Sequence, residues 1–494
     1  MEENRFNLVD EPWINIESYG LVSLKSLFEK NIYKRISGTP IEKIAILKLL
    51  QGICQAAWTP TDEDEWKKGG EERLSKECLD YLEKYKDRFF LYGQRPFLQS
   101  PNIKDDKRTK KCSLGIINIE NASGNTTIWS QMQREKYLSD AEKAVMLITL
   151  MGFALGGKKW GSDPIYNPFE DREEKSSPSG INLKKGLLHS FCFGNTILQT
   201  LWLNLLVKEN LEGKYTQKDP PWIWESMPEP FHTENSLITE YAKSVTSRLV
   251  PLSRFCLFSK NQENEDVIFI TKGMVYPLTE IDPSVSYGDK KSLMCDPKKR
   301  PWRNLPAMLA FLGTNEKERY DCFQLEIAIK RSANLSCISA IEIWSGGVKV
   351  SNNAGEEYFN ADDDFVESSI NLPKTTLNKN YFTNFQTEIK FLQSLSKILK
   401  ESIKKYFKSL NAGEDLNKSE LLFWQFCEKR LSNLVKACES SEEIAKIRNK
   451  FILDAENTFN AVCHKNTARE LDAWAAAFTE FKHKLIKEKN GSNR

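Results

Sequence analysis

The sequence predicts an α+β protein, with a large mixed α/β domain over residues 1–370 and an antiparallel four-helix bundle over residues 380–490. In the first three quarters of the chain, short alternating apolar runs are interspersed with amphipathic helical segments, which indicates mixed structure. In the last quarter, four successive segments repeat apolar residues three or four positions apart. Four amphipathic helices with short links favour an antiparallel bundle. The predicted linker runs from Leu372 to Lys379.

Composition predicts a large soluble protein and excludes several classes. The 494 residues are 40% hydrophobic and 28% charged, enough for a sizeable core and two or three domains. Seventy Lys and Arg against 68 Asp and Glu leave a net charge of +2, so any nucleic-acid contact must come from local patches. Eleven scattered cysteines, no signal-peptide pattern and no apolar run of membrane-spanning length predict a reduced, cytoplasmic protein without a membrane partner.

The first part of the chain predicts both strands and helices. Strand patterns surround Trp13-Ile14 and Leu21-Val22, and a helix is expected from Ile41 to Ala57. The charged stretch from Asp62 to Asp87 is also largely helical in pattern. Mixed α and β structure follows.

The stretch from Asn121 to Trp160 is the first candidate for function. Ser139 is a predicted cap for a buried helix from Asp140 to Leu155. The loop before it contains Asn125, Thr126 and Trp129, a mixture of hydrogen-bonding groups and one aromatic that suits a sugar-phosphate backbone and a stacked base. An ordinary surface loop is the alternative interpretation.

The glycine pair after this helix is the second candidate. Gly156 and Gly157 permit close approach of the backbone to a ligand, and Lys158 and Lys159 add phosphate-binding charge. The alternative is a helix C-cap, with lysines that only complement the helix dipole.

The middle of the chain alternates strands and turns. A strand is expected from Val267 to Thr271 and a helix from Leu305 to Leu312. Between them a basic cluster surrounds Trp302; its members are Lys298, Lys299, Arg300 and Arg303. A basic cluster with an aromatic can bind nucleic acid, but Trp302 can equally be a buried anchor beside solvated charges.

A turn and a bundle complete the pattern. A strand from Ala340 to Trp344 leads into glycines and then Asn352-Asn353, which favour a tight turn at the tip of a hairpin. In the first bundle helix, lysines that include Lys400 and Lys404 lie away from the apolar stripe. They are either solvated or in contact with DNA or a partner subunit.

Catalytic motifs are not found in the sequence. Phosphate-binding, nucleophile-elbow and zinc-protease motifs are missing, and the four histidines form no metal-binding spacing. The acidic run from Asp362 to Asp364 is typical of a solvated turn, since a two-metal site needs ligands from several elements. We therefore expect no catalytic residue, no metal and no cofactor.

Several segments in order resemble one known family. The segments are Phe6-Asn7-Leu8-Val9-Asp10-Glu11-Pro12-Trp13-Ile14, Leu21-Val22-Ser23-Leu24, Arg95-Pro96-Phe97-Leu98-Gln99, Ser123-Gly124-Asn125-Thr126-Thr127-Ile128-Trp129, Phe153-Ala154-Leu155-Gly156-Gly157, Pro301-Trp302-Arg303 and Asp363-Asp364-Phe365-Val366-Glu367-Ser368. Together they resemble the large subunit of the type I-E CRISPR surveillance complex, the CasA family of Cascade. The resemblance covers most of the chain.

The resemblance implies a non-catalytic subunit whose partners are a CRISPR guide RNA, the other Cascade subunits, double-stranded target DNA and an effector helicase-nuclease. Such a subunit inspects duplex DNA for a short target-adjacent motif and helps open it, while base pairing reads the rest. Alternative functions are a metal-dependent nuclease and a purely structural assembly protein. Cleavage of DNA by the isolated chain with magnesium would select the first of these, and lost assembly with retained DNA recognition the second.

The resemblance also assigns roles to particular residues. It implies that Asn125, Thr126 and Trp129 anchor the subunit at the guide RNA, although the family has a phenylalanine where this chain has Trp129. Gly156 and Gly157 resemble the glycine loop that approaches the motif from the minor groove, although Lys158 and Lys159 follow at once where other members are richer in glycine. Lys272 is the nearest counterpart of a further lysine probe. The strand-separating wedge would fall at Val350 to Gly355, with Asn352 and Asn353 in place of a glutamine. Possible DNA-backbone contacts are Lys298, Lys299, Arg300, Arg303, Lys400 and Lys404.

Overall fold

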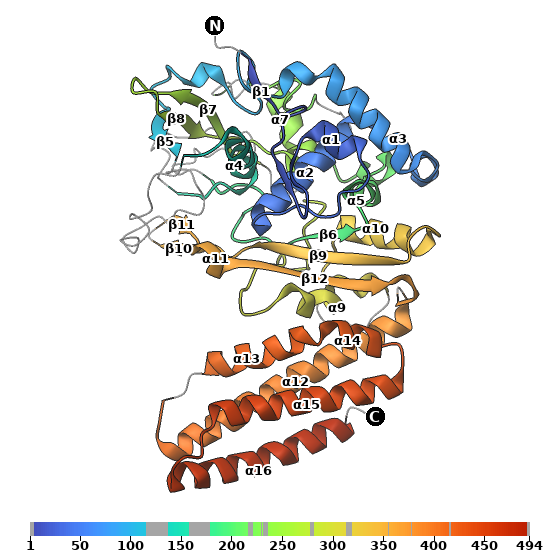
Figure 1. The fold of residues 1–494 in the computed structure, drawn as a ribbon, viewed down its shortest axis with the longest axis vertical. Coiled ribbons are helices and arrows are strands. Elements are labelled where there is room, and N and C mark those ends of the chain that lie inside the picture. The colour runs from blue at the N-terminus through green and yellow to red at the C-terminus, as the bar shows by residue number, and fades with distance from the viewer. Residues whose placement is uncertain are drawn as a thin grey trace. The chain divides into compact units, whose positions relative to one another are not determined.

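A computed structural model describes residues 4–114, 137–157, 178–215, 221–228, 230, 236–276, 281–312, 319–353, 355–376, 378–413 and 416–491. The chain divides into two compact units. The first comprises Met1–Pro301, Cys322–Leu335 and Ile343–Ser368, and the second comprises Trp302–Asp321, Ser336–Glu342 and Ser369–Arg494. Helices and strands alternate in the first unit and helices dominate the second, which confirms the predicted α+β class (Figure 1).

The amino-terminal part of the first unit is built around one buried helix, α2. The elements up to residue 153 are β1 (Arg5–Asn7), β2 (Ile14–Ile16), β3 (Gly20–Val22), α1 (Leu24–Glu29), α2 (Pro40–Ala57), α3 (Glu63–Lys84), β4 (Phe90–Tyr92), β5 (Lys110–Ser113) and α4 (Asp140–Phe153). Helix α2 contacts α3 and α4, and apolar side chains from Ile41 to Ile53 are buried around it. The predicted helices over Ile41–Ala57 and Asp62–Asp87 are confirmed within one to three residues.

Helix α4 begins where its sequence predicts. The Ser139 hydroxyl accepts a hydrogen bond from the Glu142 N–H, and the Glu142 carboxylate accepts one from the Ser139 N–H at 2.9 Å, a capping box. The helix ends at Phe153 and not at the predicted Leu155, because Ala154 already has ψ 132°. The chain therefore leaves the helix two residues before the glycine pair.

The rest of the first unit contributes strands to two three-stranded sheets. The remaining elements of that part of the chain are β6 (His189–Phe193), α5 (Ile197–Asn204), α6 (Lys208–Leu211), α7 (Ser236–Ala242), α8 (Thr246–Leu249), β7 (Arg254–Lys260), β8 (Asp266–Lys272), α10 (Phe323–Asn334), β9 (Ala340–Val348), β10 (Ser351–Asn353), β11 (Glu356–Tyr358), α11 (Ala361–Asp364) and β12 (Phe365–Pro373). One sheet has the order β5-β8-β7 and the other β12-β9-β6, whose strands β9 and β12 are each divided between the units. The predicted strands near residues 267 and 340 are confirmed.

The predicted tight turn is a β-hairpin. Strands β10 and β11 pair antiparallel, with Asn352 opposite Glu357 and Asn353 opposite Glu356. The Asn352 side-chain oxygen accepts a hydrogen bond from the Gly355 N–H at 3.2 Å, and Gly355 has φ +87°. The turn is thus closed by the Asn352 side chain and by the positive φ that Gly355 can adopt.

The second unit contains the helical bundle. Its helices are α9 (Leu305–Met308), α12 (Lys379–Leu410), α13 (Leu416–Lys429), α14 (Leu431–Ala437), α15 (Ser441–Val462) and α16 (Ala468–Gly491). Helix α12 contacts α13, α15 and α16, and Figure 1 shows the long helices side by side. The predicted four-helix bundle is confirmed, but its second helix is broken at Arg430, whose guanidinium instead pairs with Asp454. The helix predicted over Leu305–Leu312 is only α9 followed by a 3-10 turn at Ala310–Leu312.

The bundle core also contains one buried ion pair. The Arg448 guanidinium donates to both carboxylate oxygens of Glu388, with Nε at 2.8 Å from Oε2. Both side chains are almost inaccessible to solvent. Such a pair fixes which faces of α12 and α15 meet, whatever its net contribution to stability. Within the described ranges, no helix combines the length and apolarity that a membrane crossing requires.

Candidate nucleic-acid interface

The glycine pair and the hairpin, which are about 200 residues apart in the sequence, are joined in the first unit. The Gly156 N–H donates to the Glu357 carboxylate at 2.8 Å, and the Glu357 N–H donates to the Gly156 carbonyl at 3.2 Å. Glu357 therefore binds both backbone polar groups of Gly156. The two segments that were predicted to read the motif and separate the strands are therefore hydrogen-bonded to each other, with both glycines buried at the junction.

Gly157 has a backbone that other residues rarely adopt. Its φ is +138°, and a Cβ placed on it would lie 2.0 Å from the Glu356 Oε2 atom. The backbone angle favours glycine here, whereas the Glu356 carboxylate lies at the end of a flexible side chain that can move aside. In this structure the backbone of Gly157 lies close to the Glu356 side chain of the hairpin.

A buried arginine closes the base of the glycine turn. The Arg254 guanidinium donates to the Leu155 carbonyl at 2.7 Å and to the Pro178 carbonyl at 3.0 Å. Burial lowers the Arg254 pKa to about 10, and the charge of Glu357 opposes that shift, so Arg254 stays cationic at neutral pH. The Ser179 hydroxyl donates to Glu357 at 2.6 Å. Arg254 and Glu357 together hold the backbone on both sides of residues 158–177.

A second buried polar network includes Asn182, which lies shortly after residues 158–177 in the sequence. The Lys48 ammonium is paired with Asp282 and donates to the Asn182 side-chain oxygen at 3.0 Å. The Asn182 N–H in turn donates to the Gly152 carbonyl at the end of α4, and its own carbonyl lies 2.8 Å from His189 Nε2. Burial lowers the Lys48 pKa, and it also lowers the His189 pKa to about 4, with Lys48 as the second cause. His189 is thus a neutral structural residue at physiological pH.

The lowered pKa of His189 leads us to expect a loss of stability in acid. An unfolded histidine takes up a proton near pH 6.5, whereas buried His189 does so only near pH 4, so the unfolded state binds more protons between these values. The free energy of unfolding should fall by roughly 3 kcal/mol as pH drops through this window. Urea unfolding at pH 7, 6, 5 and 4 measures the slope. His189→Gln should flatten it, and the exposed His483→Gln should leave it unchanged.

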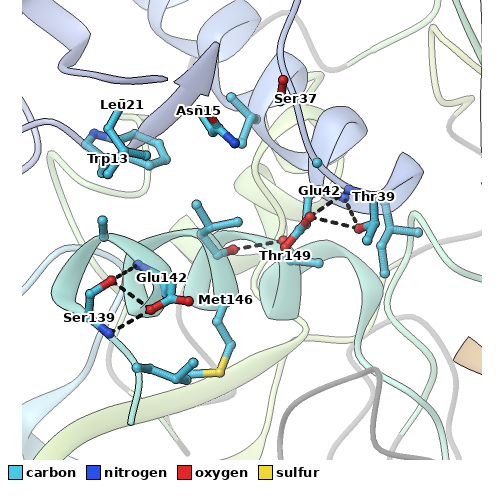
Figure 2. A pocket seen from close by; sticks show the side chains of 16 residues that line it. Trp13, Asn15, Leu21, Ser37, Thr39, Glu42, Ser139, Glu142, Met146 and Thr149 are labelled. Atoms are coloured by element: carbon cyan, nitrogen blue, oxygen red, sulfur yellow. Dashed lines mark hydrogen bonds between the residues drawn. The ribbon is translucent and has the colours of Figure 1, made fainter. Parts of the chain in front are cut away.

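A pocket beside α4 is poorly suited to phosphate. It has a volume of about 450 Å³ and is lined by residues of β2, β3, α2 and α4, among them Trp13, Glu42, Glu142 and Met146. Figure 2 shows that the glutamates at the starts of both helices are bonded to their own caps, Thr39 and Ser139. Because the backbone donors at these helix starts are partly occupied and the described lining includes no cation, we do not assign nucleic acid to it.

The structure places the other predicted residues in different surroundings. Asn125, Thr126, Trp129, Lys158 and Lys159 lie outside the described residues. Lys272, at the end of β8 opposite Arg254, retains only 8% of its exposure. Gly156 and Gly157 are buried as well, so contact of DNA with the glycine pair or with Lys272 stays a prediction.

The basic cluster is divided between the two units. Lys298 and Lys299 follow Asp296 in a turn that their own N–H groups close, and the Arg300 guanidinium donates to the Glu367 carbonyl at 3.2 Å. These three residues belong to the first unit, and Lys298 and Arg300 are exposed.

Trp302 and Arg303 belong to the second unit and are parts of its packing. Trp302 retains 3% of its exposure and meets Trp424 edge-on at 6.0 Å between ring centroids. The Arg303 guanidinium lies 3.5 Å from the centre of the Trp424 ring. Of the two interpretations left open, the buried anchor is correct for Trp302. Arg303 is partly exposed and its guanidinium covers Trp424, and its contact with DNA stays a prediction.

On α12, the two lysines singled out from the sequence differ. The Lys400 ammonium lies 3.4 Å from Glu420 in an exposed ion pair with α13, and Lys404 is exposed. Exposed pairs contribute little to stability, so Lys400 remains accessible to a stronger anionic partner. Backbone contacts by Lys298, Lys299, Arg300, Lys400 and Lys404 stay predictions.

The residues missed by sequence reasoning are Arg254, Glu357 and Ser179. No local pattern marks them: Glu357 follows another glutamate in a short strand, and Arg254 begins an apolar strand. Their importance follows only from contacts between segments far apart in the sequence.

The comparison with known families decides the assignment. The model of the family described as CRISPR-associated protein Cse1 matches residues 7–465. The chain belongs to the Cse1 family. A curated member, CRISPR-associated protein CasA/Cse1 of Thermus thermophilus, is 30% identical over 240 residues, which are 45% of this chain and only 43% of that protein. The suspected resemblance is therefore confirmed.

Solved structures show the same fold as this Cse1-family chain. A crystal structure of CasA from Thermus thermophilus matches with a TM-score of 0.73 and 21% identity, covering 98% of this chain and all of that one. A chain from a structure named CRISPR RNA-guided surveillance complex matches with a TM-score of 0.69 and 16% identity, covering 97% and 99%. At these identities the likeness establishes the fold alone.

Proposed function

We propose that this Cse1-family chain is the non-catalytic large subunit of an RNA-guided antiviral complex. In this role it recognises a target-adjacent motif in double-stranded DNA, helps start strand opening and recruits the effector helicase-nuclease. The observation that carries the proposal is the joining of Gly156 to the β10–β11 hairpin through Glu357. Membership of the family, and the likeness to a chain of an RNA-guided surveillance complex, support the same role.

The chemistry of the glycine turn suits a motif reader. The minor groove offers few distinguishing groups, so a compact backbone probe distinguishes families of related motifs and not single sequences. Gly156 and Gly157 are buried but have no side chain that would hold DNA away from their backbone, and Lys158 and Lys159 supply charge for the flanking phosphates. The adjoining hairpin, with Asn352 and Asn353 exposed near its tip, lies where the first base pairs beside the motif must separate.

One member of the acidic run has a role within the fold. Among the described residues, no group of three or more His, Cys, Asp or Glu is placed to hold a metal ion. Asp364 of the acidic run is buried and accepts hydrogen bonds from the Asn360 backbone N–H at 2.7 Å and its side-chain amide at 3.1 Å. Its carboxylate therefore has a structural partner.

Reconstitution tests the whole proposal. The tagged chain, guide RNA and the small subunits from the native host are combined, and binding to duplexes with and without the motif is compared by native gel. We expect one complex that prefers motif-bearing duplex. Equal binding to both duplexes contradicts motif recognition, and magnesium-dependent cleavage by the isolated chain contradicts the non-catalytic assignment.

We expect Trp129 to contribute to attachment of this subunit to the guide complex. Loss of one base stacked on an aromatic ring costs about 1 to 3 kcal/mol, so Trp129→Ala should weaken attachment roughly 5- to 150-fold. Titration of labelled variant into the complex that lacks the large subunit measures this, with Trp129→Phe as the variant that keeps the ring. Equal attachment of the alanine variant and the parent would exclude Trp129 as an anchor.

A further inference from the structure

Glu357 connects the glycine turn to the hairpin by hydrogen bonds from both its side chain and its backbone. Its carboxylate accepts from the Gly156 N–H at 2.8 Å and from the Ser179 hydroxyl at 2.6 Å. Its backbone N–H donates to the Gly156 carbonyl at 3.2 Å, and within the hairpin it pairs with Asn352. One residue thus connects the proposed motif reader, the backbone after residue 177 and the proposed wedge.

A buried arginine lies beside the same connection. Glu357 is half-buried, and the buried guanidinium of Arg254 interacts with it. Arg254 also holds the carbonyls of Leu155 and Pro178, the residues beside the two donors to Glu357. Hydrogen bonds to an ionised acceptor are stronger than neutral ones, so this set resists displacement of either segment alone.

We infer that Glu357 is a positioning residue that couples motif reading to strand opening, an inference that rests on the proposed function. When DNA contacts Gly156 and Gly157, any shift of that backbone passes through Glu357 to the strand that carries the hairpin turn. Conversely, a hairpin held in place by Glu357 keeps the glycine turn in one arrangement before DNA arrives. Motif recognition and strand opening therefore both depend on Glu357.

A set of variants separates this role from simple structural support. In the assembled complex, Glu357→Ala should lower affinity for motif-bearing duplex roughly tenfold, the factor that corresponds to about 1.4 kcal/mol. It should also slow strand opening at saturating DNA, followed by 2-aminopurine fluorescence. Pre-melting the base pairs beside the motif should restore the opening signal but not the affinity. Glu357→Gln, which keeps one acceptor oxygen, should lie between parent and alanine variant in both measurements.

Two controls accompany these variants. Glu263→Gln removes one negative charge at an exposed turn of the same unit and should match the parent. Ser179→Ala removes one hydrogen bond to Glu357 without touching the glycines or the hairpin, and should give a smaller loss in both measurements. If the Glu357→Ala variant does not assemble into the complex, the affinity and opening rate of Ser179→Ala test the inference in its place.

The outcomes distinguish the inference from the proposed function. A parent complex that binds motif and non-motif duplexes equally contradicts the proposed function itself. A parent that discriminates, with Glu357→Ala and Ser179→Ala equal to it in affinity and in opening rate, overturns only the inference. A Glu357→Ala variant that loses affinity but opens saturating DNA at the parent rate also overturns it, because the two activities are then not coupled.

Discussion

Replacing Gly157 with valine is expected to reduce binding of motif-bearing duplex to the level of duplex without the motif, while the guide complex remains assembled. The φ of +138° is unfavourable for any side chain, and a β-branched side chain blocks approach of the backbone to the groove floor. At about 1 to 3 kcal/mol for each recognised base pair, losing two pairs lowers affinity about 30-fold or more. Titration of labelled duplexes into the assembled complex measures the loss.

The structure supplies a sharper control for this variant. A Cβ at position 157 would also displace the Glu356 carboxylate, 2.0 Å away, and that displacement alone could disturb the hairpin. Glu356→Ala in the Gly157→Val background removes the collision and keeps the added valine side chain. Continued loss of selectivity in the double variant supports the groove-approach explanation. Recovery of selectivity would instead show that Gly157 is needed only to accommodate Glu356.

The elements that the sequence predicted well are those set by local chemistry. Ser139 with Glu142, and Thr39 with Glu42, are capping boxes that mark helix starts without reference to the rest of the fold. The apolar stripe of α12 likewise predicts its buried face, from Phe385 to Tyr406. The break of the second bundle helix at Arg430 was missed, because the Asp454 partner of Arg430 is on another helix.

The candidate site was only half predictable for the same reason. Two glycines and two asparagines carry local signals, since each permits or favours a backbone shape. That they belong to one site depends on Glu357, whose partner Gly156 is 201 positions away. A single sequence carries no trace of such a pairing. Trp302 shows the converse: its basic neighbours suggested a surface role, but its contact with Trp424 places it in a core.

Replacing both Asn352 and Asn353 with alanine is expected to leave motif-dependent binding nearly intact and to slow strand opening. Opening the duplex costs on the order of 1.4 kcal/mol for each base step, and guide pairing offsets this only after it has begun. If the two exposed side chains hold the first step open, their loss should slow opening roughly tenfold. The 2-aminopurine signal on intact duplex measures the rate, and a duplex already melted beside the motif should restore it.

The turn geometry indicates how the two asparagines differ. The Asn352 oxygen accepts from the Gly355 N–H at 3.2 Å and so helps close the turn, whereas the exposed Asn353 precedes it at the end of β10. Asn353→Ala alone should therefore reproduce most of the opening defect with the turn intact, and Asn352→Ser, whose hydroxyl can still accept, should retain most of the parent rate. If the double variant opens intact duplex as fast as the parent, the hairpin tip is only a turn, and the first base pairs must be separated by another part of the complex.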